Sequence, residues 1–325
     1  MKHILIAAAI ENDQRRDNED ALVCARNISD MFSSDCAYSF SMVTIRSEDF
    51  NSSGAIIKKV QPDGVLNLFE GFNDCPEKEA EFVSQLEKEN IRFTGNGSET
   101  LALCIDKDKC KKKLLSHGIS VPEGISVYDG DIPDLDGIIY PVFVKPLKED
   151  ASVGIDRSSF CKNRKSLELV LSEKIRKYPK GVLVERFMPG VEYSLSFIGH
   201  NPYKLLAVSS IDYSMLPENT PFMTYSSKWD THDPDYSAVT PAIMKNVDHS
   251  IYDKIVMPAS RAGQAAGCRG YFRVDMRADS EGNIYVIDIN PNPCISCDSG
   301  FIRQAEEAGY SYKEIIVKIL EEAGV

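Results

Sequence analysis

Two strand-like segments in the last third of the chain carry the side chains with the clearest potential for chemistry. Arg273 and Asp275 lie two residues apart in the first segment, and Asp288 and Asn290 lie two apart in the second. Side chains alternate between the two faces of a strand, so each pair shares one face. If the segments pair across the short turn between them, all four side chains can lie together.

Acidic side chains on an otherwise apolar strand pair cost free energy unless a cation neutralises them. Two carboxylates and an amide oxygen are hard ligands that suit Mg²⁺ or Mn²⁺, with phosphate oxygens completing the coordination. We therefore predict metal binding by Asp275, Asp288 and Asn290. The alternative interpretation is that Asp275 forms an ordinary ion pair with Arg273 and that Asp288 caps a turn.

Two further segments could bind a nucleotide. Lys145 ends an apolar strand ahead of a loop of small residues that includes Ser152, and such a loop can present backbone N–H groups to a polyphosphate. Glu185 and Phe187 share a strand face that could contact an adenine, and Glu192 is placed for ribose hydroxyls. The alternatives are an edge-strand lysine that extends to water and an exposed strand acid.

Length, charge and cysteine content limit the class of protein. The 325 residues suit two domains of ordinary size or three small ones, and the formal net charge of −12 disfavours a protein that follows a nucleic-acid backbone. No apolar run approaches the ~20 residues that cross a bilayer, and nine cysteines are typical of reduced thiols in cytoplasm. We expect a cytoplasmic protein with neither nucleic acid nor membrane as partner. We interpret Cys294 and Cys297, which form a C-x-x-C, as a coincidental loop pair rather than a zinc or redox site.

Local patterns predict the elements that position these residues. Strand-like runs at 4–10 and 65–69 alternate with helical stretches at 21–32 and 78–89, which indicates a parallel sheet. No G-x-G-x-x-G follows the first strand, so we do not expect a dinucleotide site there.

Asp106 can cap a helix that runs to Ser116 and ends at Gly118. We interpret the lysines of that helix as a solvated basic face. The other predicted elements are strands at 138–144 and 181–187, a hairpin at 271–290, and a C-terminal helix opened by a capping box at Ser311 and Glu314.

Taken in this order, the segments resemble the ATP-grasp superfamily and, within it, the D-alanine:D-alanine ligase-like family. The resemblance extends from about Pro62 onward. Its motifs are Leu66-Asn67-Leu68-Phe69-Glu70-Gly71, Phe93-Thr94-Gly95, Leu101-Ala102-Leu103, Ile105-Asp106-Lys107, Val144-Lys145-Pro146, Ser152-Val153-Gly154, Val182-Leu183-Val184-Glu185, Pro189-Gly190-x-Glu192, Arg273-Val274-Asp275 and Ile287-Asp288-Ile289-Asn290.

The resemblance implies a mixed α/β (α+β) protein with the ATP-grasp fold in three lobes. The implied units are an N-terminal parallel-sheet (Rossmann-like) pre-ATP-grasp domain at 1–97, a central lobe at 98–180, and a C-terminal lobe at 181–325 with the metal site and a substrate loop. The implied activity is ATP-dependent ligation of a carboxylate to an amine through an acyl phosphate, with release of ADP and phosphate. Mg²⁺ or Mn²⁺, as two ions, and a possible homodimer are implied as well.

The same resemblance gives roles to individual residues. Arg273 matches an arginine that stabilises the acyl phosphate, and Lys228 matches a loop lysine that reaches the γ-phosphate. The implied ATP contacts are Lys107, Lys145, Ser152, Glu185, Phe187 and Glu192, the implied substrate contacts are Trp229 and Ser299, and the implied metal ligands are Asp275, Asp288 and Asn290.

The chain departs from the family pattern at substrate positions. The family's N-terminal glutamate has no clean counterpart among Glu11, Asp13, Glu19 and Asp20. Ala151 replaces the first of two loop serines, and Cys294 stands where the family usually has glycine. We therefore expect ligation of amino-acid or short-peptide substrates with shifted specificity; the alternatives are an authentic D-alanine:D-alanine ligase of cell-wall synthesis and a non-catalytic ATP-binding protein.

Overall fold

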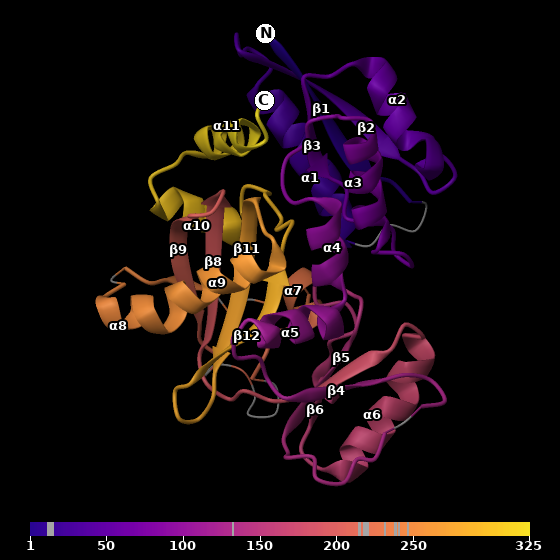
Figure 1. Cartoon of the computed structure of the whole chain (residues 1–325), viewed down its shortest axis with the longest axis vertical. Coiled ribbons are helices and arrows are strands. Elements are labelled where there is room, and N and C mark those ends of the chain that lie inside the picture. Colours follow the sequence, from indigo (N-terminus) through magenta and orange to yellow (C-terminus); the bar gives the residue numbers. More distant parts are fainter. Residues whose placement is uncertain are drawn as a thin grey trace.

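The computed structural model describes residues 1–11, 16–131, 133–213, 216, 221–230, 232–236, 239, 241–245 and 247–325. These residues form three β-sheets (Figure 1). No helix among them is long and apolar enough to span a membrane.

The N-terminal sheet is parallel and buried on both faces. Its strands β1 (Lys2–Ala9), β2 (Tyr38–Ile45) and β3 (Gly64–Leu68) follow the order β2-β1-β3. Ile4 and Ile6 of β1 pack with α1 (Arg16–Met31), whereas Leu5 and Ala7 pack with α2 (Ser53–Val60) and α3 (Lys78–Lys88). Helices on both faces explain why β1 is a continuous apolar run.

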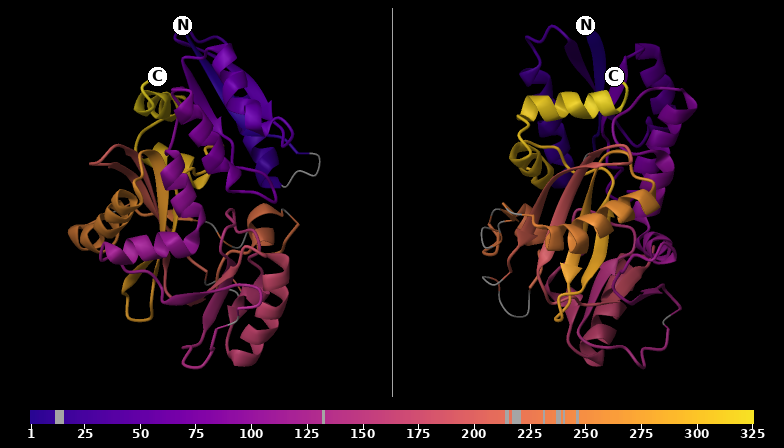
Figure 2. Two further views of the ribbon diagram at one scale, coloured as in Figure 1. Left: turned by 45° about the vertical axis from the view of Figure 1, so that its right-hand side comes forward. Right: turned by 60° about the vertical axis from the view of Figure 1, so that its left-hand side comes forward.

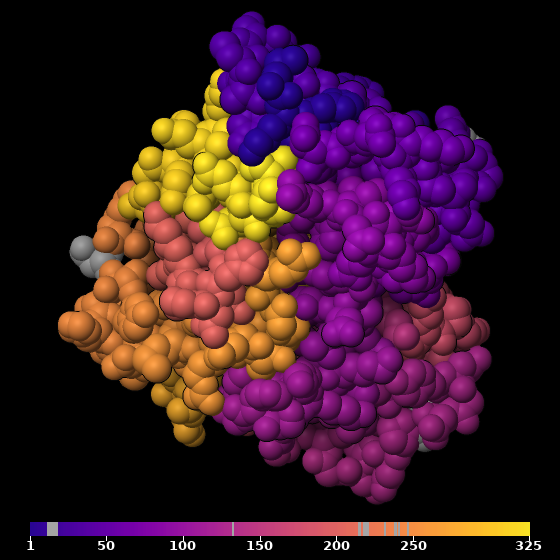
Figure 3. All heavy atoms as spheres, turned by 45° about the horizontal axis from the view of Figure 1, so that its top comes forward, coloured from indigo at the N-terminus to yellow at the C-terminus, as the bar shows by residue number. Residues whose placement is uncertain are grey.

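The C-terminal helix belongs to the same packing layer as α1. α11 (Tyr312–Glu322) buries Ile315, Ile316 and Ile319 in one core with β1 and α1. Figure 2 shows this yellow helix beside the N-terminal unit, and in Figure 3 the yellow and indigo surfaces adjoin. The two ends of the sequence therefore stabilise one unit.

The second sheet is antiparallel. Its order is β4-β7-β5-β6, with β4 at Gly124–Val127, β5 at Val142–Pro146, β6 at Phe160–Cys161 and β7 at Val182–Arg186. The helix α6 (Arg164–Lys177) covers one face through Leu167 and Leu171. Before this sheet come α4 (Ser98–Ile105) and α5 (Lys107–Ser116), and the 3₁₀ turns η1 and η2 span Phe50–Ser52 and Arg157–Ser159.

The third sheet is antiparallel and carries the predicted hairpin. It follows the order β10-β9-β8-β11-β12, with bounds β8 Glu192–Gly199, β9 Lys204–Ile211, β10 Ala242–Ile243, β11 Gly270–Ala278 and β12 Ile284–Asn290. The remaining helices are α7 (Tyr225–Trp229), α8 (His249–Ile251), the π-helix η3 (Tyr252–Val256), α9 (Met257–Ala266) and α10 (Gly300–Glu307).

Helices cover both faces of this sheet. α9 packs closely on β11, because a Cβ built at Gly263 would lie only 2.4 Å from the Phe272 ring. On the opposite face Phe301 of α10 packs against Tyr271. The sheet is thereby held between α9 and α10.

Most sequence expectations for the elements are confirmed. The parallel N-terminal sheet, the hairpin, the Asp106 cap and the Ser311–Glu314 capping box are present, and Gly118 ends its helix region with a positive φ of 68°. The strand expected from 138 begins only at Val142. The unit boundaries at 97 and 180 stay predictions, and β7, just beyond 180, pairs with β4 and β5.

Candidate active site

One large cavity collects the predicted site residues from the second and third sheets, from the helices α5 and α7, and from the loops between them. Its volume is about 980 Å³. Every residue that the sequence marked for a site lines it: Lys107, Lys145, Ser152, Glu185, Phe187, Glu192, Lys228, Trp229, Arg273, Asp275, Asp288, Asn290 and Ser299. Residues more than 190 positions apart in the chain thus share one space.

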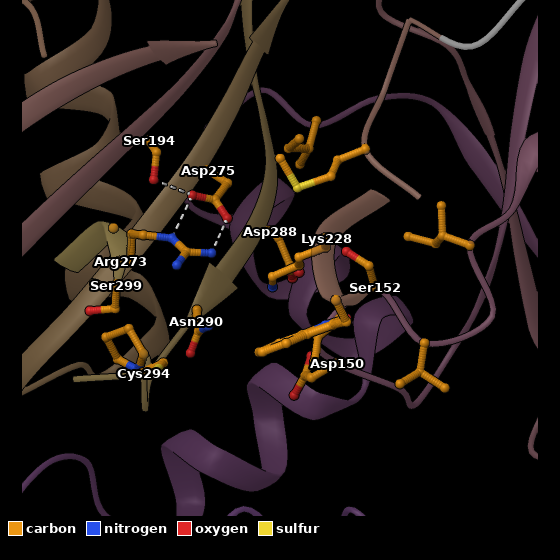
Figure 4. Close-up of a pocket in the computed structure, with 18 of the residues that line it drawn as sticks. Asp150, Ser152, Ser194, Lys228, Arg273, Asp275, Asp288, Asn290, Cys294 and Ser299 are labelled. Carbon is orange, nitrogen blue, oxygen red and sulfur yellow. Dashed lines mark hydrogen bonds and ion pairs between the residues drawn. The ribbon is translucent and has the colours of Figure 1, made fainter. Parts of the chain in front are cut away.

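The hairpin register brings the four polar residues of β11 and β12 onto one face. Arg273 is opposite Asn290, and Asp275 is opposite Asp288. Arg273 Nε and Nη2 donate to the two oxygens of Asp275 at 2.9 and 2.8 Å, and Ser194 Oγ donates to Oδ1 at 2.8 Å (Figure 4). Burial alone would raise the pKa of Asp275, but Arg273 outweighs burial and lowers it. The ion pair considered from the sequence is therefore present.

Asp288 has the opposite electrostatic balance. Burial raises the pKa of its carboxyl group, although Lys107 and Lys145 act in the other direction. A divalent cation would favour the ionised form of such a group. Two carboxylates and one amide oxygen fit Mg²⁺, which usually keeps several waters or phosphate oxygens in its coordination shell. The donor set fits the metal that the sequence pattern predicts.

Glu185 lies between two lysines. Lys145 Nζ is 2.7 Å from Glu185 Oε1, and Lys111 Nζ is 2.7 Å from Oε2. Burial would raise the pKa of Glu185, yet the two ammonium groups lower it to about 2. Lys145 also donates to the Ile287 carbonyl at 3.3 Å, which ties the second sheet to the third.

This arrangement rules out one alternative interpretation, for Lys145, and corrects one expectation, for Lys111. Lys145 lies on β5, an inner strand of the second sheet, and its side chain is 9% exposed rather than extended to water. Lys111 was expected on a solvated face, but its side chain is only 15% exposed. The signal for Lys111 was its spacing, because residues four apart on a helix share a face and Lys107 also points inward.

Lys107 is a second cation that lines the cavity beside Lys145. Its Nζ donates to the Glu149 carbonyl at 2.5 Å and lies 3.4 Å from Asp150 Oδ1. Burial alone would lower the pKa of Lys107, but Asp288 and Asp150 raise it above its usual value. Lys107 thus stays charged and, with Lys145, offers ammonium groups to an anionic ligand such as a polyphosphate.

The far end of the cavity combines aromatic rings with a buried acid. Phe187 packs against Phe143 and Phe222, with ring centroids 6.2 and 6.4 Å away. Glu192 accepts a hydrogen bond from Tyr213 Oη at 2.9 Å, and burial raises the pKa of its carboxyl group. A flat aromatic base and a hydroxyl-bearing sugar would suit these two surfaces.

Sequence reasoning missed the residue that joins these two surfaces. Arg277 lies 4.6 Å from the centroid of the Phe187 ring and 3.4 Å from Glu192 Oε2. It also lies 5.0 Å from the Tyr213 ring centroid. Its position two residues beyond Asp275 was the available signal, because the register of β11 with β8 is unbroken and Arg273, Asp275 and Arg277 all line the cavity.

A short helix closes one side of the cavity. α7 begins with a capping box at Thr224 and carries Lys228 and Trp229. Trp229 Nε1 donates to the Ala151 carbonyl at 3.0 Å. Ala151 and Ser152 have positive φ angles of 52° and 64°, a conformation that costs free energy in non-glycine residues and is typical of functional loops.

Lys228 lines the cavity, where its charge is affected by Arg273 and Asp275. Its pKa is lowered by burial and by the neighbouring Arg273. Its Nζ also lies 5.0 Å from the Trp229 ring centroid. The cavity therefore holds a lysine that loses its proton more easily than an ordinary one.

The remaining end of the cavity lies against the N-terminal unit. Ser296 Oγ donates to Asp20 Oδ2 at 2.7 Å, and Cys294 Sγ donates to the same oxygen at 3.1 Å. Ser299 caps α10 by accepting from the Ile302 N–H at 3.3 Å.

Of the four N-terminal acids weighed from the sequence, Glu19 and Asp20 line the cavity, Glu11 Oε2 accepts from the Asn73 N–H at 2.9 Å, and Asp13 lies outside the described residues. Cys297 is exposed. Among the residues that the structure describes, no group of three or more His, Cys, Asp or Glu could hold a metal ion.

Comparison with known proteins places the chain in a family. Residues 135–321, more than half of the chain, match the family model described as the D-ala D-ala ligase C-terminus. The chain belongs to this family. The predicted family and the ATP-grasp fold are confirmed, and with them the prediction of an ATP-dependent, ATP-grasp ligase that forms a carbon–nitrogen bond.

Individual relatives agree with this membership. The D-alanine–D-alanine ligase of Glaesserella parasuis serovar 5 is 28% identical over 271 residues, which is 82% of this chain and 83% of the relative. The corresponding ligase of Acinetobacter baumannii is 28% identical over 242 residues, 73% of each chain.

Solved structures share the fold at lower sequence identity. The D-alanine–D-alanine ligase of Bacillus anthracis complexed with ATP has a TM-score of 0.77 at 18% identity, covering 99% of this chain and 97% of that one. VanG D-Ala:D-Ser ligase from Enterococcus faecalis has a TM-score of 0.72 at 17% identity, covering 99% of both.

Proposed function

We propose that this ligase joins two amino-acid-like substrates through an acyl phosphate, and that at least one of them is not D-alanine. The observation that carries the proposal is the composition of the cavity described above. Two buried cations, Lys107 and Lys145, and three oxygen donors suited to Mg²⁺ line the same cavity as Arg273, whereas the part of the cavity near Asp20 and Cys294 differs from the family pattern. This contrast supports a ligase that keeps its ATP contacts and has changed its substrate contacts.

The chemistry follows from charge. An oxygen of the carboxylate substrate would attack the γ-phosphorus of ATP, and the bond from that phosphorus to ADP would break. Lys107 and Lys145 would hold the phosphates, and Mg²⁺ bound by Asp275, Asp288 and Asn290 would neutralise their charge during transfer. In the proposal the ions number two.

The second step would form the amide. The amine nitrogen would attack the acyl carbon, and the bond between the acyl carbon and the phosphate oxygen would break, so that phosphate leaves. The nitrogen would then lose a proton. Arg273 would stabilise the oxyanion that develops on the acyl oxygen, and Lys228 would bind the transferred phosphoryl group. The hydrogen bond from Trp229 to the Ala151 carbonyl would hold α7 over the cavity, so that water does not hydrolyse the acyl phosphate.

The substrate end supports an altered specificity. Asp20, held by Ser296 and Cys294, presents a carboxylate from α1 that could bind a substrate ammonium group. The Cys294 side chain lines the cavity at a position where a glycine would have no side chain. Ser299 lies at the start of α10, where it could contact a carboxylate.

The test is ATP turnover with a chemically broad substrate pool. Purified protein with Mg²⁺ and ATP would be incubated with mixtures of D- and L-amino acids, with ADP release measured by a coupled assay and products identified by mass spectrometry. We expect ADP release with a product other than D-alanyl-D-alanine. The same assay with an Asp288→Asn variant controls for contaminating ATPases.

The outcomes separate the alternatives. Turnover with D-alanine alone, giving D-alanyl-D-alanine, would establish an authentic D-alanine:D-alanine ligase, the reaction for which its relatives are named. Nucleotide binding without turnover in every pool would identify a non-catalytic ATP-binding protein. Either result would refute the proposed specificity. Sedimentation analysis tests whether the protein forms the proposed homodimer.

A further inference from the structure

A buried polar network joins the N-terminal unit to the loop that follows β12. Asn292 Nδ2 donates to Glu79 Oε1 at 2.7 Å, and Tyr271 Oη donates to Asn292 Oδ1 at 2.8 Å. Tyr271 is fully buried and Glu79 is 8% exposed. Both polar ends of the Asn292 side chain are therefore occupied, one by α3 and one by β11, which allows only one orientation of its amide.

The main chain of Asn292 reaches the predicted metal site. Its N–H donates to Asn290 Oδ1 at 3.1 Å. An amide oxygen has two lone pairs, so Asn290 Oδ1 can accept this bond and still bind a cation. The position of the Asn290 oxygen thus depends on the position of the Asn292 backbone.

A second buried asparagine holds the same loop. Asn96 Nδ2 donates to the carbonyls of Tyr271 and Pro291 at 3.0 and 2.6 Å, and Asn96 is 2% exposed. Hydrogen bonds therefore hold the loop at Pro291 and at Asn292, the two residues that follow Asn290. Buried networks in which every member has a partner are rigid, and they lose much of that rigidity when one member is removed.

We propose that Asn292 is a positioning residue that fixes Asn290 for metal binding through its bonds to Glu79 and Tyr271. This inference rests on the proposed function only in taking Asn290 as a metal ligand. It makes metal affinity depend on Glu79, a residue of the N-terminal unit. Groups that orient metal ligands typically contribute about 10- to 100-fold to metal affinity.

The test measures Mn²⁺ binding rather than turnover. Mn²⁺ would be titrated into the full chain saturated with a non-hydrolysable ATP analogue, with free Mn²⁺ followed by electron paramagnetic resonance. We expect Asn292→Ala to raise the Mn²⁺ dissociation constant about 10- to 100-fold. The matched control is Asn67→Ala, because Asn67 is also a buried asparagine, 2% exposed, whose side-chain oxygen accepts from the Phe69 N–H at 3.2 Å within the N-terminal unit. Its backbone N–H donates to Thr94 Oγ1, a hydrogen bond that the substitution keeps.

A pair of isosteric substitutions separates positioning from folding. Asn292→Asp replaces the donor that faces Glu79 with an oxygen, and we expect it to weaken Mn²⁺ binding. Adding Glu79→Gln supplies an N–H donor from the opposite side, so the double variant should recover Mn²⁺ affinity to within about threefold of the wild type. Thermal midpoints of all variants would be recorded in parallel.

The inference is overturned if Asn292→Ala binds Mn²⁺ as the wild type does, if Asn67→Ala weakens binding equally, or if the double variant is no better than Asn292→Asp. Turnover of the wild type is measured separately. Absence of ADP release with every substrate pool would refute the proposed function while leaving the Mn²⁺ comparison intact, and normal turnover with unchanged Mn²⁺ binding in Asn292→Ala would refute only the positioning role.

Discussion

Replacing Glu185 with glutamine removes one negative charge from between two buried ammonium groups. Lys111 and Lys145 each approach a different oxygen of this carboxylate at 2.7 Å, and the Glu185 side chain is 5% exposed. The two lysines lower the pKa of Glu185 from its usual 4.5 to about 2. At about 1.4 kcal/mol per pH unit, the ionised form contributes on the order of 3 kcal/mol to the free energy of unfolding.

The sign of the pH dependence follows from the lowered pKa. The contribution is complete above pH 4.5, where Glu185 is ionised in both folded and unfolded chains, and it is lost as pH falls from 4.5 through about 2. About half should remain near pH 3. We therefore expect Glu185→Gln to lower the free energy of unfolding by on the order of 3 kcal/mol at pH 7, and by less at pH 3.

Urea unfolding followed by circular dichroism at pH 7, 5, 4 and 3 measures this difference. Glu168→Gln is the matched control, because Glu168 also pairs with a basic residue, Arg164, but lies 53% exposed, and it should leave stability unchanged. Lys111→Met and the double variant complete a cycle that isolates the Lys111–Glu185 coupling. A loss of stability that does not vary between pH 7 and 3, or no loss at all, would refute the charged triad.

Three further variants test the site. Asp288→Asn should reduce ADP release at least ~100-fold without lowering the thermal midpoint, because it removes a metal ligand together with a buried carboxyl whose pKa is raised by burial. Trp229→Phe should raise the ratio of ADP to amide product, because the bond from Nε1 to the Ala151 carbonyl is lost and water enters. Lys228→Arg should shift the alkaline limb of the pH–rate profile to higher pH. The lowered pKa of Lys228 sets the pH at which this lysine loses its charge, whereas an arginine keeps its charge to higher pH.

Each of these has an outcome that contradicts it. Unchanged ADP release in Asp288→Asn would remove Asp288 from the metal ligands. A one-to-one ratio of ADP to amide in Trp229→Phe would mean that α7 does not protect the acyl phosphate. An alkaline limb at the same pH in Lys228→Arg would assign that limb to another group. Tryptophan fluorescence and circular dichroism check that each variant is folded.

The sequence predicted which site residues of the hairpin share a strand face within each strand, because alternation alone determines this. Arg273 and Asp275 share a face for the same reason that any residues two apart on a strand do, and so do Asp288 and Asn290. A bulge between the turn and these residues then brings the two pairs opposite each other, and the sequence pattern did not predict that bulge. The cap at Asp106 and the capping box at Ser311 were equally local. Patterns of this kind need no knowledge of the rest of the fold.

Contacts between distant segments could not be read from the same patterns. Lys111 looked like a surface lysine until β7 brought Glu185 to it, and Asn292 looked like a loop residue until α3 brought Glu79 to it. Whether a polar group is solvated or buried depends on which element covers it, and this tertiary arrangement decides its charge and its partners. The roles of such residues became visible only in the assembled fold.

The measurement that tests the central claim most directly is product identification by mass spectrometry after incubation of the purified protein with Mg²⁺, ATP and a mixed pool of D- and L-amino acids. The proposed function predicts an amide product other than D-alanyl-D-alanine, formed in a one-to-one ratio with ADP and abolished in Asp288→Asn. D-alanyl-D-alanine as the sole product, or no product from any pool while the nucleotide still binds, would contradict it.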